Sequence, residues 1–167
     1  MAYSLVKLTP TTVAAEIAAG DVLFDSTEFQ LPAKACKLVS VTMVDFEKQL
    51  MRDDFTFIFH QDNAGGTFGA SGDAEALSVA NAILNVPIGI VRVTSELYGI
   101  FANFSMFSSA AGDAVAALNS SPIILERDDN DRKIYVTCRC EAVSTAGTLA
   151  GTNADGGDLA IYLGFEY

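Results

Sequence analysis

The sequence has little of the chemistry on which catalytic and metal sites depend. It contains one histidine, His60, and three cysteines, Cys36, Cys138 and Cys140, in 167 residues. A single histidine excludes a zinc site built from two or three imidazoles. An odd number of cysteines is no disulfide framework, and the spacing of Cys138 and Cys140 is too short for a Cys-x-x-Cys redox or zinc pair. We expect all three cysteines to be small buried apolar residues.

Positive charge is also scarce. The chain carries 10 Lys and Arg against 21 Asp and Glu, which gives a net charge of −11. A field of this sign repels phosphate backbones and anionic lipids, so we expect no nucleic-acid partner and no membrane partner. Solubility is the simplest role for the charge, and a basic protein surface or divalent cations stay open as partners. Because only 19% of the residues are charged, some apolar surface should face a partner.

Long hydrophobic runs are missing as well. No stretch approaches the roughly 18 apolar residues of a membrane span. Residues 1–10 lack the basic segment and long apolar core of a secretory signal. No internal repeat or linker is evident. These features predict one soluble domain over residues 1–167, made in the cytoplasm.

What the sequence does contain is alternation of apolar and polar residues with period two, the pattern of strands that have one core face. The expected strands cover residues 22–29, 39–43, 55–60, 86–94, 98–107, 122–126, 134–142 and 159–166. In these strands we expect the core faces to include Val39, Val41 and Met43, and also Phe55, Phe57, Phe59, Ile134, Val136, Cys138, Cys140, Leu159, Ile161, Leu163 and Phe165. The fold class predicted is all-β, an antiparallel β-sandwich or jelly roll with long Gly/Asp-rich loops.

Helices and loops fill the remaining segments. Helical signal is limited to residues 74–82, which Asp73 could cap, and to residues 113–118. Residues 62–72 and 146–157 are expected to be long glycine-rich loops, the first of them a mobile surface loop. Residues 128–131 are expected to form a tight turn, because Asp and Asn tolerate left-handed backbone conformations.

No motif assigns a catalytic, cofactor-binding or metal-binding residue, so each of these sets is predicted to be empty. No Gly-x-Ser-x-Gly motif supplies a serine that His60 could activate. We expect His60 at the surface or at the base of a loop. The loop at residues 65–72 lacks the lysine of a phosphate-binding loop. Two oxygen-rich segments, residues 128–131 and the group Asn153, Asp155 and Asp158, favour turns over calcium sites. The absence of tryptophan weakens a sugar-binding platform without excluding one built from tyrosine.

Several segments together resemble small virion proteins of tailed phages. These are the opening segments LTPTT (8–12), AGDVL (19–23) and LVSVTMVD (38–45), the strand DFTFIF (54–59), the loop at 62–75, and the closing segments at 132–139 and 158–164. The resemblance spans most of the chain, and residues 77–84 and 101–107 depart from it. The family it indicates is that of β-sandwich capsid decoration (cement) proteins.

The resemblance implies a non-enzymatic role in the virion. Such a protein would self-associate as a homotrimer and bind the major capsid protein on the outer surface of the shell. One alternative is an adaptor associated with the tail, neck or fibre. From other classes, a carbohydrate- or calcium-dependent binding module stays open, and so does a hydrolase that uses His60 as its base.

Overall fold

The computed structural model describes eleven stretches of the chain: residues 1–12, 16–46, 54–66, 68–74, 83–93, 98–100, 105–110, 123–127, 131–142, 147–148 and 159–167. Their secondary structure is almost entirely β, and every strand pair is antiparallel. The predicted all-β antiparallel fold is thereby confirmed. Within these stretches, no helix has the length and apolarity to cross a membrane.

The strands are β1 (Tyr3–Leu8), β2 (Glu16–Ile17), β3 (Val22–Gln30), β4 (Ala35–Asp45), β5 (Asp54–His60), β6 (Pro87–Val93), β7 (Tyr98–Ile100), β8 (Ser105–Ala110), β9 (Ile123–Glu126), β10 (Lys133–Ala142), β11 (Gly147–Thr148) and β12 (Leu159–Glu166). The predicted strands match β3, β4, β5, β6, β9, β10 and β12 to within a few residues. The expected single strand at 98–107 is two strands, β7 and β8. Strand β1 was not predicted, and β11 lies inside the predicted loop at 146–157.

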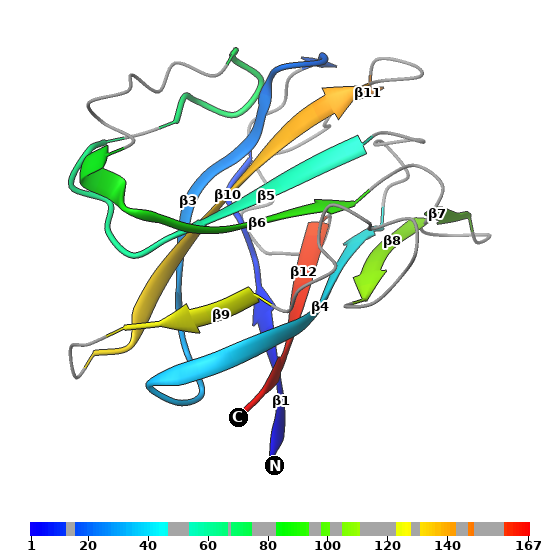
Figure 1. Ribbon diagram of the computed structural model, residues 1–167. Helices are drawn as coiled ribbons and strands as arrows, with labels where there is room; N and C mark the ends of the chain where they lie inside the picture. The colour runs from blue at the N-terminus through cyan, green and yellow to red at the C-terminus, as the bar shows by residue number, and fades with distance from the viewer. Residues whose placement is uncertain are drawn as a thin grey trace.

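Two main sheets form the sandwich (Figure 1). The larger sheet has six strands in the order β1-β12-β4-β8-β7, with β9 also paired to β4. The smaller main sheet has four strands in the order β3-β10-β5-β6, and β11 pairs with β2 in a separate ribbon. The first and last strands of the chain are neighbours, so the two chain ends lie side by side (Figure 1).

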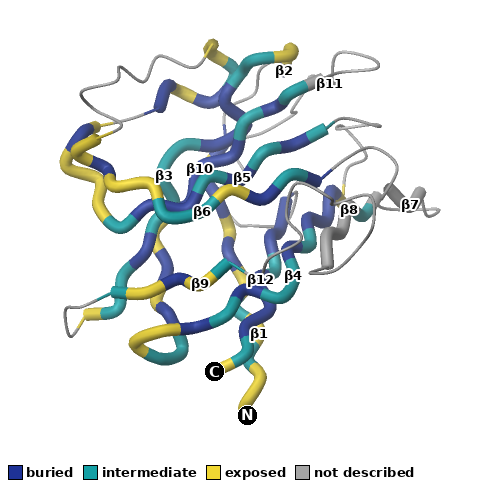
Figure 2. Tube along the Cα trace, in the orientation of Figure 1, coloured by how far each residue is buried: buried dark blue, intermediate teal, exposed yellow. Residues whose placement is uncertain are grey.

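The core lies between the two main sheets, and Figure 2 shows buried positions alternating with partly exposed ones along the central strands. Phe55, Phe57 and Phe59 have no exposed surface, as the alternation of β5 predicts. The predicted core faces of β10 and β12 are buried in the same way. Aromatic contacts tie the sheets together: Phe29 stacks on Phe165 of β12 with ring centroids 6.1 Å apart. The core is therefore built from the residues that the period-two pattern selects.

Strand β4 departs from its predicted face. We expected Val39, Val41 and Met43 to point into the core, but the core side chains of β4 include Leu38, Val41 and Met43, and Val39 is only partly buried. The pairing with β12 shifts register at this point, because Gly164 lies opposite Ser40 whereas Phe165 lies opposite Leu38. Val39 is the extra residue of a β-bulge, which reverses the inward and outward alternation.

The predicted helices lie mostly outside the described residues. Of the stretch 74–82 only Ala74 is described, in a bridge to Asp21, and a short helical turn follows at residues 83–85. Residues 113–118, 128–130, Asn153, Asp155 and Asp158 are all outside the described stretches. The expected turn at 128–131 is described only at Asp131, which is in a turn.

Candidate functional site

A loop covers the outer face of the four-stranded sheet, around His60. The described parts of this loop, residues 61–66 and 68–74, are anchored at several points. The backbone N–H of Phe68 donates to the Asp25 carboxylate (3.0 Å), and the Ser71 hydroxyl donates to the Leu23 carbonyl oxygen (2.7 Å). Phe68 is 2% exposed. This segment, predicted as a mobile surface loop, docks onto β3 and buries its own aromatic side chain.

His60 lies beneath that loop, at the end of β5. Its Nδ1 is 2.7 Å from the carbonyl oxygen of Asp62, and its Nε2 is 3.3 Å from the Ser26 hydroxyl and 3.4 Å from the Thr137 hydroxyl. The imidazole stacks on Tyr135, with ring centroids 5.8 Å apart, and also contacts Phe68. Its side chain has no exposed surface. His60 is thus at the base of a loop, as one of our expectations had it, but it is not at the surface.

These contacts define the tautomer of the neutral His60 ring. A carbonyl oxygen can only accept a hydrogen bond, so Nδ1 carries the proton and Nε2 accepts from the neighbouring hydroxyls. Burial lowers the pKa of His60, against smaller raising effects of the Asp62 carbonyl and the Asp25 and Asp62 carboxylates. A histidine that is neutral, buried and bonded at both nitrogens could not take a proton from a substrate unless the loop moved. The arrangement connects three strands and a loop.

We expect stability to fall as the pH drops below about 6.5, the ordinary pKa of histidine. The folded-state pKa of His60 is lowered, so the unfolded chain binds the proton first. The contribution of His60 to stability is therefore fully present above pH 6.5. It falls progressively as the pH decreases from 6.5 to the folded-state pKa. This single group contributes a slope of at most about 1.4 kcal/mol per pH unit.

Urea unfolding of the wild type and of His60→Gln, from about pH 8 to about pH 5, measures this effect. Glutamine keeps hydrogen-bonding atoms but does not titrate, so the variant should be less stable at pH 8 and should lose less stability on acidification. Parallel pH profiles for the two proteins would contradict a neutral, buried His60.

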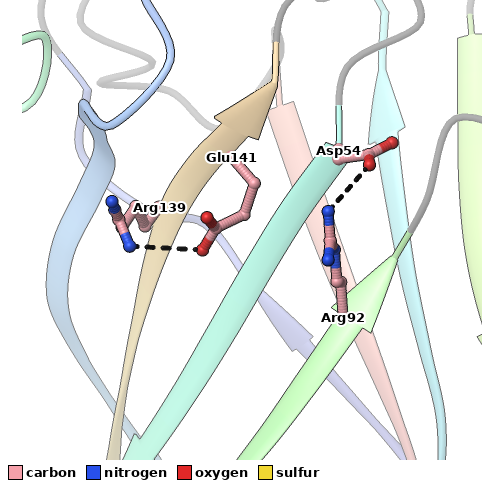
Figure 3. A network of polar contacts seen from close by, with 4 residues as sticks. All are labelled: Asp54, Arg92, Arg139 and Glu141. Atoms are coloured by element: carbon pink, nitrogen blue, oxygen red, sulfur yellow. Dashed lines mark hydrogen bonds and ion pairs between the residues drawn. The ribbon is translucent and has the colours of Figure 1, made fainter. Parts of the chain in front are cut away.

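Ion pairs occupy the far end of the same outer face (Figure 3). Arg92 of β6 pairs with Asp54 of β5 at 3.1 Å, and Arg139 pairs with Glu141, both on β10, at 3.4 Å. Thr56 lies between the two arginines in the ladder, because it is opposite Arg139 on one side and Arg92 on the other. These pairs are partly exposed, so each contributes about 1 kcal/mol or less. Among the described residues, each of these two pairs matches one positive charge with one negative charge.

The cysteines occupy apolar positions. Cys36, Cys138 and Cys140 are all buried and unbridged, as small apolar residues would be. Burial raises the pKa of Cys36 and raises the pKa of Cys138 well above that of an ordinary thiol. A thiol is a poor nucleophile and metal ligand in this state, because the thiolate is the reactive form. In the described part of the chain, no three His, Cys, Asp or Glu side chains gather in a way that could hold a metal ion.

Exposed apolar side chains occur at the β6 edge of the four-stranded sheet and on β9 of the other main sheet. We use the name apolar strip for this set of exposed aliphatic side chains: Ile83, Leu84, Val86, Ile90 and Ile124. Strands β6 and β9 belong to different sheets but meet closely, since a Cβ on Gly89 would lie 2.6 Å from the Cγ2 methyl of Ile123. Neither the strip nor the burial of His60 was predicted, because both depend on strands that are far apart in the sequence.

Comparisons with known proteins do not place the chain in a family. No family model matches the sequence, and no curated protein matches it. Among solved structures, the chain is similar to one from the X-ray structure of tomato aspermy virus, at 8% identity and a TM-score of 0.38. That match covers 98% of this chain and 75% of the other. At this identity and TM-score the likeness carries no argument about function, which therefore depends on the residues described above.

Proposed function

We propose that the protein is a virion structural component, a capsid decoration protein that self-associates and binds the outer surface of the major capsid shell. The observation that carries the proposal is the apolar strip. Leu84 is 54% exposed, Ile90 54% and Ile124 56%, on a chain with a net charge of −11. Exposed aliphatic groups gathered on neighbouring elements are typical of protein-binding surfaces. The virion location in this proposal rests on the resemblance of the sequence to phage decoration proteins.

The chemistry of the described residues agrees with a binding role. The one histidine is enclosed by the loop and two sheet strands, and Cys36 and Cys138 have raised pKa values. An assembly that buries the apolar strip would leave the acidic residues facing solvent or basic groups of the shell. Association of three copies would suit the three-fold positions of an icosahedral shell.

Light scattering on the pure protein tests self-association through the strip. We expect the mass of three copies, or of six where the edges of two trimers also pair, for the wild type and a lower mass for Ile124→Glu, because a carboxylate buried at an apolar contact has no partner. Lys133→Gln, a change on a partly exposed side chain of β10 that pairs with Glu28 and not with any residue of the strip, is the control and should keep the wild-type mass. A strict monomer at every concentration would contradict the trimer.

Location in the particle is a separate test. Purified particles of the phage that encodes the chain should carry the protein on the head, in a number of copies comparable to that of the shell subunit. Immunogold labelling and quantitative mass spectrometry measure both quantities. Label confined to the tail or neck, with few copies per particle, would replace the decoration role with that of an adaptor.

A further inference from the structure

Among the described strands, β1 forms one edge of the six-stranded sheet and pairs with β12 alone. Ala2 and Tyr167 exchange two backbone hydrogen bonds, of 2.8 and 3.1 Å. In an antiparallel ladder the hydrogen-bonded pairs alternate, so Ser4, Val6 and Leu8 bond to β12. The N–H and C=O groups of Tyr3, Leu5 and Lys7 therefore point away from the sheet. These groups have no partner among the residues that the structure describes.

The side chains of the same three residues are also exposed. Tyr3 is 70% exposed and Leu5 65%, and Lys7 is in the exposed class too. Side chains two apart on a strand share a face, so Tyr3, Leu5 and Lys7 form one row beside a free backbone edge. An edge with open hydrogen-bonding groups and apolar side chains is a template for another strand.

We propose that this edge pairs with the β1 edge of a second copy, antiparallel, about a two-fold axis at Leu5. In this register Leu5 lies opposite Leu5 of the second copy, and Tyr3 lies opposite Lys7. Each of the three pairs exchanges two backbone hydrogen bonds, which joins the two six-stranded sheets into one. The contact is isologous, so it closes on two copies.

The charge of Lys7 favours this antiparallel register and a second copy of the chain as the partner. Lys7 is the only charged side chain of β1, and the two-fold pairing places it against the ring of Tyr3, where a cation–π contact is favourable. A parallel, in-register pairing would instead set Lys7 against Lys7, and like charges directly opposite each other are destabilising. The same lysine thus opposes open-ended stacking and permits the closed pair.

The edge pairing is independent of the proposed function, because it uses β1 and leaves the apolar strip free. If the strip also joins three copies, the two contacts together would give a six-copy assembly. A substitution on β1 would then divide the mass by two, whereas one on the strip would divide it by three. Failure of either contact can therefore be told from failure of the other.

Cysteine cross-linking tests the register. In the two-fold pair the Cα atoms at position 5 are about 5.5 Å apart, within the range that a disulfide bridges. We expect oxidised Leu5→Cys to give a disulfide-linked dimer. Tyr3→Cys alone should give none, because its two copies would lie more than about 13 Å apart. A mixture of Tyr3→Cys and Lys7→Cys should cross-link. The native cysteines are all buried, so they do not compete.

Sedimentation equilibrium at high protein concentration tests the affinity. We expect Leu5→Glu to raise the dissociation constant of the edge contact several-fold, since it sets two carboxylates opposite each other. Leu5→Gln, which has a similar shape but no charge, should raise it less. Equal cross-linking of Leu5→Cys and Tyr3→Cys, or the same assembly mass for wild type and Leu5→Glu, would overturn the proposal.

Discussion

Replacing Phe57 by alanine is expected to lower the free energy of unfolding by about 3–5 kcal/mol. Phe57 has no exposed surface and lies in the centre of β5, between β10 and β6. Its ring contacts Phe24 of β3 at a centroid distance of 6.3 Å. Removing it leaves a cavity that the surrounding strands cannot close, because both of its neighbouring strands are held by their ladders.

Thr56→Ala is the matched control for this change. Thr56 is the preceding residue of β5 and points to the outer face, where it is only partly buried. Its loss should cost about 1 kcal/mol or less, mainly through strand propensity. Urea unfolding at one fixed protein concentration measures both variants, since association would make the midpoint depend on concentration. Equal losses for the two variants would contradict the assignment of the core face.

Replacing Gly89 by alanine is expected to destabilise the fold by about 1–3 kcal/mol. The new Cβ would lie 2.6 Å from Cγ2, 3.4 Å from Cδ1 and 3.7 Å from Cβ of Ile123. A β-branched side chain has few χ1 alternatives, so Ile123 cannot simply turn away. Gly89 is not among the residues with positive φ, and the cost therefore comes from the contact between β6 and β9.

A double-mutant cycle separates this contact from the effect of removing a glycine. In the Ile123→Ala background the steric conflict is gone, and Gly89→Ala should be neutral or stabilising by about 0.5–1 kcal/mol, because alanine is the better strand residue. A contact between the two residues therefore makes Gly89→Ala less destabilising in the Ile123→Ala background than in the wild type. If Gly89→Ala costs the same in both backgrounds, β6 and β9 do not approach each other as closely as described.

The core was the most predictable part of the protein. The alternation of phenylalanines from Phe55 to Phe59 and of aliphatic residues along residues 159–165 is a local signal, and every one of these core positions is buried. The error at Val39 has a non-local cause. The bulge there depends on the register with β12, more than a hundred residues later in the chain, and no pattern within β4 marks it.

The surface features were less predictable for the same reason. His60 is buried because residues 61–66 and 68–74 fold back over it, and that docking depends on Asp25 and Leu23 of another strand. Ile124 and Leu84 look like ordinary core residues in the sequence. Their exposure appears only when β9 and the segment before β6 take places at the rim of the sandwich.

By itself the sequence determined the all-β class, most of the strands, and the side chains that form the core, because period-two alternation is carried by neighbouring residues. It also limited the chemistry to one histidine and three unbridged cysteines. Only the tertiary structure decided which of the described strands are edges, which aliphatic side chains are exposed, and that Tyr3, Leu5 and Lys7 form one exposed row. These properties depend on pairings such as β1 with β12, which join opposite ends of the chain and which no local pattern encodes.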